Sequence, residues 1–323
     1  MEKKPSYGGQ AVIEGVMMQG PGGKAIAVRQ QDGGIVYKVG KRKMLKEKYP
    51  ILGLPVIRGV VSFFESFLVG LQDLTWASAQ YGDAEYDKLS PREIFITVMI
   101  AFMMALTLFV GLPVFVGTVA YPYVGDFGRS LIEGLLRITV FVLYVLIVSK
   151  VPEIKRLFAY HGAEHKTIAC YEAGEVLTVE AARKYSKVHP RCGTSFIFMV
   201  FLLTILIFTF IGRGNAWYRI LIKILCFPLV AGVSYELFRL PVYFPKNRLV
   251  HALVAPGLCM QRLTTNEPDD DQLAVAIAAI TAVPGFPAEQ IAVVENPQNI
   301  ENPEHMEAAA AQSESTAESI INR

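Results

Sequence analysis

The chain has 323 residues, of which 52% are hydrophobic and 19% charged, and its formal net charge at pH 7 is +2. Its mean hydropathy of +0.36 is higher than an ordinary water-soluble domain needs, so the composition argues against a purely soluble protein. A basic run near the N-terminus is explained more simply by contact with anionic lipid headgroups than by contact with RNA. The lipid bilayer is therefore an expected partner, and no nucleic acid is expected.

Residues 1–50 are predicted to form a small cytoplasmic β unit. Short strands are expected at 11–18, 24–30 and 34–39, and Asp32-Gly33-Gly34 is a turn signal between the last two. The first residues, MEKKPSYGGQ, have no apolar core behind them, so a cleaved signal peptide is not expected.

Residues 51–80 are predicted to form an amphipathic helix. The segment 54–80 is apolar around most of its circumference, but Arg58, Ser62, Glu65 and Asp73 lie close to one stripe. Because charges are costly at mid-bilayer, two arrangements remain open: an interfacial helix, or a helix whose polar stripe faces other parts of the protein.

Four segments are apolar enough and long enough to cross a hydrocarbon core, which takes roughly 20 helical residues. They are 94–120 and 131–148, within a first pair (92–150), and 196–211 and 217–240, within a second pair (196–243). Lys and Arg are concentrated at 38–48 and 150–191, whereas the short connections near Tyr121 and Gly212 hold only Arg129 and Arg213. The charge bias predicts that both termini and the long loop 151–195 are cytoplasmic.

The loop 151–195 contains the pattern His161-Gly-Ala-Glu164-His165. Two histidines at i and i+4 on a helix present both imidazoles from one face, as a divalent metal requires, and the order H-x-x-E-H is that of the inverted zincins. Glu164 is then placed to act as general base on a water held by the metal. The alternative is a solvated helix face with two histidines.

A second cluster, His189-Pro-Arg-Cys192-Gly, follows in the same loop. The intervening residues 177–187 are predicted to be helical, with Thr178 as N-cap, which would fold the second cluster back onto the first. His161, His165, His189 and Cys192 are therefore candidate ligands of a zinc ion. A nucleophilic Cys192 paired with a histidine ranks below metal ligation.

Glu236, near the end of the last predicted span, is a further candidate metal ligand, because inverted zincins take a third ligand from a downstream glutamate. A salt bridge with Arg239 is the simpler interpretation. Residues 244–283 are predicted to be cytoplasmic and helical at 249–263 and 270–283, and the Pro-, Glu-, Ala- and Ser-rich residues 284–323 are predicted to be disordered.

Four motifs resemble the YqhQ-like family of bacterial membrane proteins, a family of unknown function. They are GGQAVIEGVMMQGP, YHGAEHKTIACYEAGEVLTVE, HPRCGTSF and the region from PVYFPKNRLV to NEPDDDQL. The resemblance spans about Gly8 to Val283. It implies a location in the bacterial inner membrane, and since members are sometimes labelled metal-dependent enzymes, it adds weight to the metal hypothesis without indicating a substrate.

The fold class expected is thus mainly α: a multi-pass membrane protein with about four transmembrane helices, an interfacial amphipathic helix and a small N-terminal β unit. The leading functional hypothesis is a zinc-dependent hydrolase at the cytoplasmic face, with His161, His165 and either His189 or Glu236 as ligands. If His161, His165, His189 and Cys192 all bind one zinc, no coordination position is open, and the protein is instead a scaffold or assembly factor for other membrane proteins. A transporter is third, because the spans carry few charges and no paired broken helices.

Overall fold

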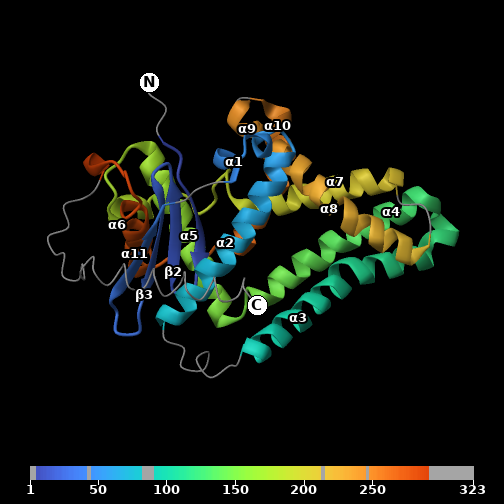
Figure 1. Ribbon diagram of the computed structural model, residues 1–323, viewed down its shortest axis with the longest axis horizontal. Coiled ribbons are helices and arrows are strands. Elements are labelled where there is room, and N and C mark those ends of the chain that lie inside the picture. The colour runs from blue at the N-terminus through green and yellow to red at the C-terminus, as the bar shows by residue number, and fades with distance from the viewer. Residues whose placement is uncertain (1–4, 42–44, 82–90, 212–214, 245–246, 291–323) are drawn as a thin grey trace.

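The computed structural model describes residues 5–41, 45–81, 91–211, 215–244 and 247–290. In Figure 1 a four-stranded antiparallel sheet, packed among helices, lies on the left, and an arm of long helices extends to the right. The described chain is mainly helical with a small N-terminal sheet, as predicted.

The sheet is a meander of β1 (Gly8–Val12), β2 (Gly15–Gly20), β3 (Gly23–Arg29) and β4 (Ile35–Gly40), in that order. The prediction of one strand over 11–18 was wrong, because the chain reverses at Glu14, which has a φ of 49°. The predicted turn at Asp32 is confirmed: Gly33 has a φ of 88°, and the Asp32 carboxylate accepts a hydrogen bond from the Gly34 N–H at 2.9 Å.

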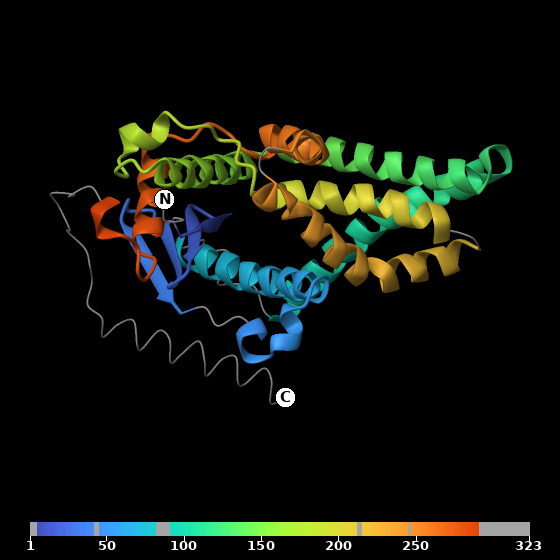
Figure 2. The ribbon, with the colours of Figure 1, turned by 90° about the horizontal axis from the view of Figure 1, so that it is seen from above.

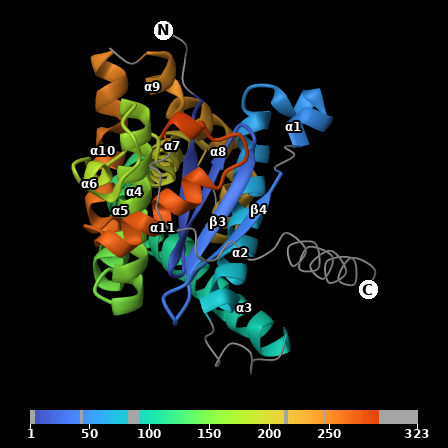
Figure 3. The same cartoon turned by 90° about the vertical axis from the view of Figure 1, so that its left-hand side faces the viewer.

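Both faces of the sheet are buried. Val16, Met18, Ala25 and Ala27 pack beneath α5 (Pro152–Ala173) and α11 (Asp270–Thr281). The alternate side chains Val12, Met17, Ile26 and Val28 pack against Ala77 of α2 (Ile57–Tyr81). Figures 2 and 3 show α5 and α2 on opposite sides of the sheet.

The charges of α2 face other parts of the protein, while large apolar side chains of the same helix, such as Phe67 and Leu68, are exposed. The contacts of the polar stripe fit the second arrangement, and an interfacial position of the apolar face stays a prediction. Arg58 pairs with Glu236, and Asp73 pairs with Lys24 of β3. Glu65 accepts from the backbone N–H of Leu45, where α1 (Leu45–Lys48) begins, ahead of the short η1 turn (Pro50–Gly53).

The helical arm begins with α3 (Pro91–Leu106), the π-turn η3 (Thr107–Gly111) and α4 (Leu112–Val148). Within α4 the chain reverses at Gly125, whose φ of 67° and ψ of −169° interrupt the helix. The arm is completed by α7 (Gly193–Ile211) and α8 (Ala216–Phe238). Two helical stretches of the described chain, Ile96–Val148 and Ala216–Phe238, are long and apolar enough to cross a membrane, and Gly193–Phe208 is apolar but shorter.

Much of the segment 151–195, predicted to be a loop, is helical. It consists of the 22-residue α5, the short α6 (Val179–Arg183) and a connection to α7. Thr178 caps α6 as predicted, since its hydroxyl accepts from the Ala181 N–H at 3.0 Å. After the short α9 (Leu240–Tyr243), α10 (Arg248–Thr264) and α11 lie close to the helices predicted for this region.

The predicted disordered tail begins too early. Phe286 packs against the rings of Tyr7 and Tyr171, with centroids 5.5 and 5.4 Å away. The carbonyl of Gln290, at the end of η4 (Ala288–Gln290), accepts from the Leu177 N–H. The rest of the predicted tail, 291–323, lies outside the described residues.

Gly162 marks the closest approach between α5 and the segment after α10. A Cβ added at Gly162 would lie 2.1 Å from the carbonyl oxygen of Asn266, and that segment is held by hydrogen bonds from Asn266 to the carbonyls of Phe158 and Lys155. We expect Gly162→Ala to lower the free energy of unfolding by about 1–3 kcal/mol, because the two backbones must separate. Thermal unfolding of the purified protein measures this.

Gly40→Ala is the matched control, because nothing lies within 4 Å of a Cβ added there. Equal melting temperatures for the two variants would contradict the close contact between α5 and Asn266.

Candidate metal centre

Helix α5 carries the two histidines of the H-x-x-E-H pattern through the protein interior. It begins with Pro152 and ends at Gly174, whose left-handed φ of 86° suits glycine. Four consecutive polar side chains, Glu164 to Thr167, are buried in its middle. Because most buried polar groups are hydrogen-bonded, the contacts of these side chains show which segments the helix holds in place.

His161, His165 and Cys192 form one compact group of potential metal ligands. One ligand atom from each lies within 4.8 Å of those of the other two. The Nε2 atom of His161 is 3.2 Å from the Sγ atom of Cys192, and the two imidazole centroids are 4.4 Å apart. The structure thus brings the second sequence cluster onto the first, as predicted, through its cysteine.

The contact that Nδ1 of each imidazole makes with the backbone shows where one ring hydrogen lies. The Nδ1 atom of His161 lies 2.9 Å from the carbonyl oxygen of Thr264, and Nδ1 of His165 lies 2.6 Å from that of Lys187. A carbonyl only accepts, so each Nδ1 carries a hydrogen, and the neutral form of each imidazole has its lone pair on Nε2. The Nε2 atom of His165 is buried and has no hydrogen-bond partner in the described part of the chain. This is the orientation that metal-binding histidines adopt.

Gln261 of α10 holds the backbone that delivers Cys192. Its side-chain amide accepts from the His189 N–H and donates to the His189 carbonyl, both at 2.8 Å, and it also donates to the Ser195 hydroxyl at 2.9 Å. Between these two points the Cys192 N–H donates to the His189 carbonyl at 3.3 Å. Gln261 is fully buried, so the second cluster is anchored to α10.

His189 lies beside the group but is engaged elsewhere. Its ring centroid is 5.8 Å from that of His165, its Nε2 is 3.3 Å from the Glu172 carboxylate, and its Nδ1 accepts from the Arg191 N–H. Burial lowers the pKa of His189, and Glu164 opposes this shift. The structure does not place His189 in the ligand group.

Glu164 points toward β1, and its carboxylate accepts a hydrogen bond from the Gly9 N–H. Burial raises the pKa of Glu164, while electrostatic interaction with His161 and His189 and the Gly9 N–H oppose the shift. A Cβ at position 9 would lie 2.9 Å from the Cγ of Glu164, so the glycine allows the strand to approach the carboxylate. Glu164 is therefore close to the histidines without belonging to the ligand group.

The structure does not bring Glu236 to this group. Its carboxylate accepts from the Arg58 guanidinium, at 2.7 Å from Nε, and from the Val56 N–H at 3.2 Å. The expected salt bridge with Arg239 is replaced by one with Arg58, because α2 passes beside the end of α8. Glu236 joins two helices and is no candidate ligand in this arrangement.

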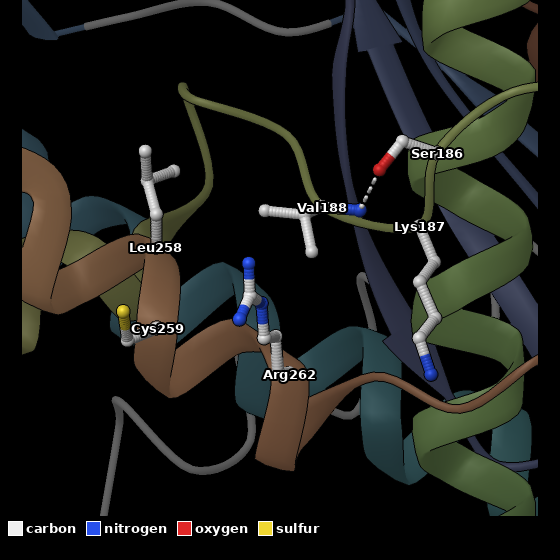
Figure 4. A pocket seen from close by; sticks show the side chains of 6 residues that line it. All are labelled: Ser186, Lys187, Val188, Leu258, Cys259 and Arg262. Atoms are coloured by element: carbon white, nitrogen blue, oxygen red, sulfur yellow. Dashed lines mark hydrogen bonds between the residues drawn. The ribbon is translucent and has the colours of Figure 1, made fainter.

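A hollow of about 640 Å³ lies beside the connection that holds His165. It is lined by Ser186, Lys187, Val188, Leu258, Cys259 and Arg262. Figure 4 shows Arg262 of α10 and Val188 pointing into the space between the two segments, with the Ser186 hydroxyl accepting from the Val188 N–H. This hollow could not be predicted from the sequence, because its two walls are more than 60 residues apart along the chain.

Comparison with known proteins identifies the family. The model of a family described as "Protein of unknown function (DUF1385)" matches residues 54–285. The chain belongs to the DUF1385 family. It is 32% identical over 287 residues to "Uncharacterized protein YqhQ" of Bacillus subtilis (strain 168), covering 84% of this chain and 90% of that protein. The resemblance seen in the sequence is thus confirmed, and no solved structure matches the chain significantly.

The matched DUF1385 residues include all three members of the ligand group. We expect the purified protein to bind about one zinc ion per chain, because the group can form a single site. The double variant His161→Ala, His165→Ala should lose this zinc. Elemental analysis of the purified protein, after dialysis against a buffer that contains a trace of zinc, measures the content.

His251→Ala is the control, since His251 lies at an exposed position on α10. Zinc content equal to wild type in the double variant would show that the histidines are not ligands.

Proposed function

We propose that this DUF1385 protein is an integral membrane zinc protein that hydrolyses a membrane-associated substrate at the cytoplasmic face. The observation that carries the proposal is the convergence of two imidazoles and one thiol, with both imidazoles oriented by backbone carbonyls. Nitrogen and sulfur ligands of this kind suit zinc.

The number of ligands favours an enzyme over a structural site. Structural zinc sites are usually closed by four protein ligands, whereas catalytic sites have three and an open position. Here three side chains converge, and the lone pair of His189 is used by the Arg191 N–H. A zinc ion in such a site would supply an activated water and polarise a carbonyl or phosphoryl oxygen.

Glu164 is the candidate proton acceptor. It lies on the same helix as both histidines and interacts electrostatically with His161 and His189. The Gly9 N–H fixes one side of its carboxylate. The adjacent hollow, into which Arg262 projects, would accommodate a substrate with an anionic group.

The surface of the helical arm supports membrane insertion. Large apolar side chains of the two membrane-length stretches are exposed, among them Phe102 (55%), Phe115 (66%) and Leu225 (65%). An apolar surface of this extent is stable only when lipid or another protein covers it. With the Lys and Arg bias of the connections, the arm would cross the bacterial inner membrane several times and leave both termini, α5 and α10 in the cytoplasm.

A structural zinc site is the second candidate, because His189 is buried beside the group with its ring 5.8 Å from that of His165. If His189 turned from Glu172 to the metal, four ligands would close the site. The protein would then act as a scaffold for other membrane proteins.

Glu164→Gln and His189→Ala separate the hydrolase from the scaffold. In the hydrolase, Glu164→Gln should retain zinc and fold but lose most biological activity, because it removes the proton acceptor while keeping the size of the side chain. In the scaffold, Glu164→Gln should have little effect. Complementation of a deletion strain, with zinc content measured in parallel, gives both readouts.

Cys192→Ser is the companion variant, and it should weaken zinc binding in both cases. His189→Ala distinguishes them further, because only a four-ligand site needs that imidazole for zinc. Full activity of Glu164→Gln together with zinc loss in His189→Ala would rule out the hydrolase.

Membrane topology can be tested with cysteines at the two ends of the arm. Cys259 is exposed on α10 and should react with a membrane-impermeant maleimide only after the cells are opened. Cys170 should stay unlabelled under native conditions, because burial raises the pKa of its thiol to about 11 and the nearby Glu175 adds to the shift.

The introduced cysteine of Tyr123→Cys, at a position that is 88% exposed in the reversal of α4, should react in intact cells. Cys259→Ser in the same background identifies the labelled site. Labelling of Cys259 in intact cells would overturn the proposed orientation.

A further inference from the structure

A cluster of charged side chains is buried inside the helical arm, contrary to the expectation that the spans hold few charges. Glu133 of α4 forms ion pairs with Arg219 and Lys223 of α8. Arg219 also donates to the Thr118 hydroxyl at 3.1 Å, and Arg137 donates to the Phe109 carbonyl at 2.8 Å. Ionisable groups inside membrane-length helices are costly and mark functional sites.

The cluster carries more positive than negative charge. Among the residues that the structure describes, four bases of the cluster are each 9% exposed or less, and the acids paired with them are the buried Glu133 and the more exposed Asp126. Positive charges therefore outnumber negative ones in the described part of the cluster. Counting only arginines, which stay protonated in proteins, three bases still exceed two acids. The bases are Arg129, Arg137, Arg219 and Lys223. The bases have partners within the protein, but their positive charges outnumber the negative ones among the described residues, and such a surplus attracts an anion.

A hollow of about 430 Å³ opens at this cluster. Arg129 of α4 and Arg219 of α8 line it from two helices, and Arg129 also pairs with Asp126 at 2.8 Å and stacks on Tyr121 at 4.7 Å. The remaining lining residues are Thr118, Tyr121, Asp126, Asn215 and Ala216. Asn215 and Ala216 stand at the N-terminus of α8, where the helix dipole also favours an anion.

The hollow lies at the opposite end of the arm from the metal centre. At one end of α7, Cys192 of the metal centre directly precedes the first residue of the helix. At the other end, the hydroxyl of Ser130, next to Arg129, donates to the carbonyl of Phe208 near the last turn of α7. The 19 residues of α7 span about 28 Å, close to the thickness of a hydrocarbon core. The two sites therefore lie near opposite surfaces of the proposed membrane segment, and the second site is independent of the metal.

We propose that this hollow binds a phosphate group, held by Arg129 and Arg219. The guanidinium fork matches phosphate oxygens, and the surplus of positive charge matches an anionic phosphate. The phosphate can belong to an anionic lipid headgroup in the outer leaflet or to inorganic phosphate in solution, and both share the chemistry that the arginines recognise.

The test measures binding to the full-length protein purified in a neutral detergent. Isothermal titration with short-chain phosphatidylglycerol, inorganic phosphate and short-chain phosphatidylcholine compares an anionic lipid, the free anion and a zwitterionic lipid. Arg129→Gln should weaken binding of the anionic probe about tenfold, because a charged hydrogen bond to phosphate is lost. Asp126→Asn should strengthen it, because a carboxylate that lines the hollow is neutralised.

Arg239→Gln is the matched control, since Arg239 stands at the other end of α8, stacked on Tyr235 and Tyr243. Competition by inorganic phosphate identifies a free-anion site, and binding of phosphatidylglycerol alone identifies a headgroup site. The proposal is overturned if neither anionic probe binds, if phosphatidylcholine binds as tightly as phosphatidylglycerol, or if both Arg129→Gln and Asp126→Asn bind as wild type does.

Discussion

The structure depends on the need to pair the polar side chains buried along α5. His161, His165 and Lys166 each donate to a backbone carbonyl of another segment, namely those of Thr264, Lys187 and Arg183. Each of these bonds avoids the cost of an unpaired buried donor. Each also fixes the position of a segment that lies outside α5 in the sequence. The end of α10 and the connection before α7 are thereby held against α5, and the three potential ligands converge.

The sheet is attached to the same helix by a similar interaction. The Glu14 carboxylate, at the tight turn between β1 and β2, accepts from Arg156 and from the Tyr160 hydroxyl. The neighbouring strand brings the Gly9 N–H to Glu164. The small β unit is therefore more than an N-terminal appendage: it covers the helix that carries the proposed metal site and is tied to it by the ion pair between Glu14 and Arg156.

Particular elements show how far the sequence could be interpreted. The i, i+4 spacing of His161 and His165 and the Thr178 cap were recognisable because they depend on local helix geometry. The break at Glu14 was missed, since apolar residues lie directly on both sides of the turn. His189 and Glu236 were reasonable ligands by spacing, yet tertiary contacts gave them other partners in Glu172 and Arg58. Glu133, Arg219 and Lys223 were recognisable as charges within apolar spans, but their pairing with one another was not, because they lie on different helices.

The sequence by itself determined the features that repeat at short range: the apolar helices, the α10 and α11 segments, the H-x-x-E-H pattern and the family membership. Only the tertiary structure decided which side chains meet. Cys192 joins the histidines because the Gln261 amide, 69 residues further along the chain, holds the backbone at His189. Arg129 and Arg219 line one hollow because α4 and α8 lie side by side at the end of the arm. These contacts join residues 72 and 90 positions apart, and local propensity contains no information on such distances.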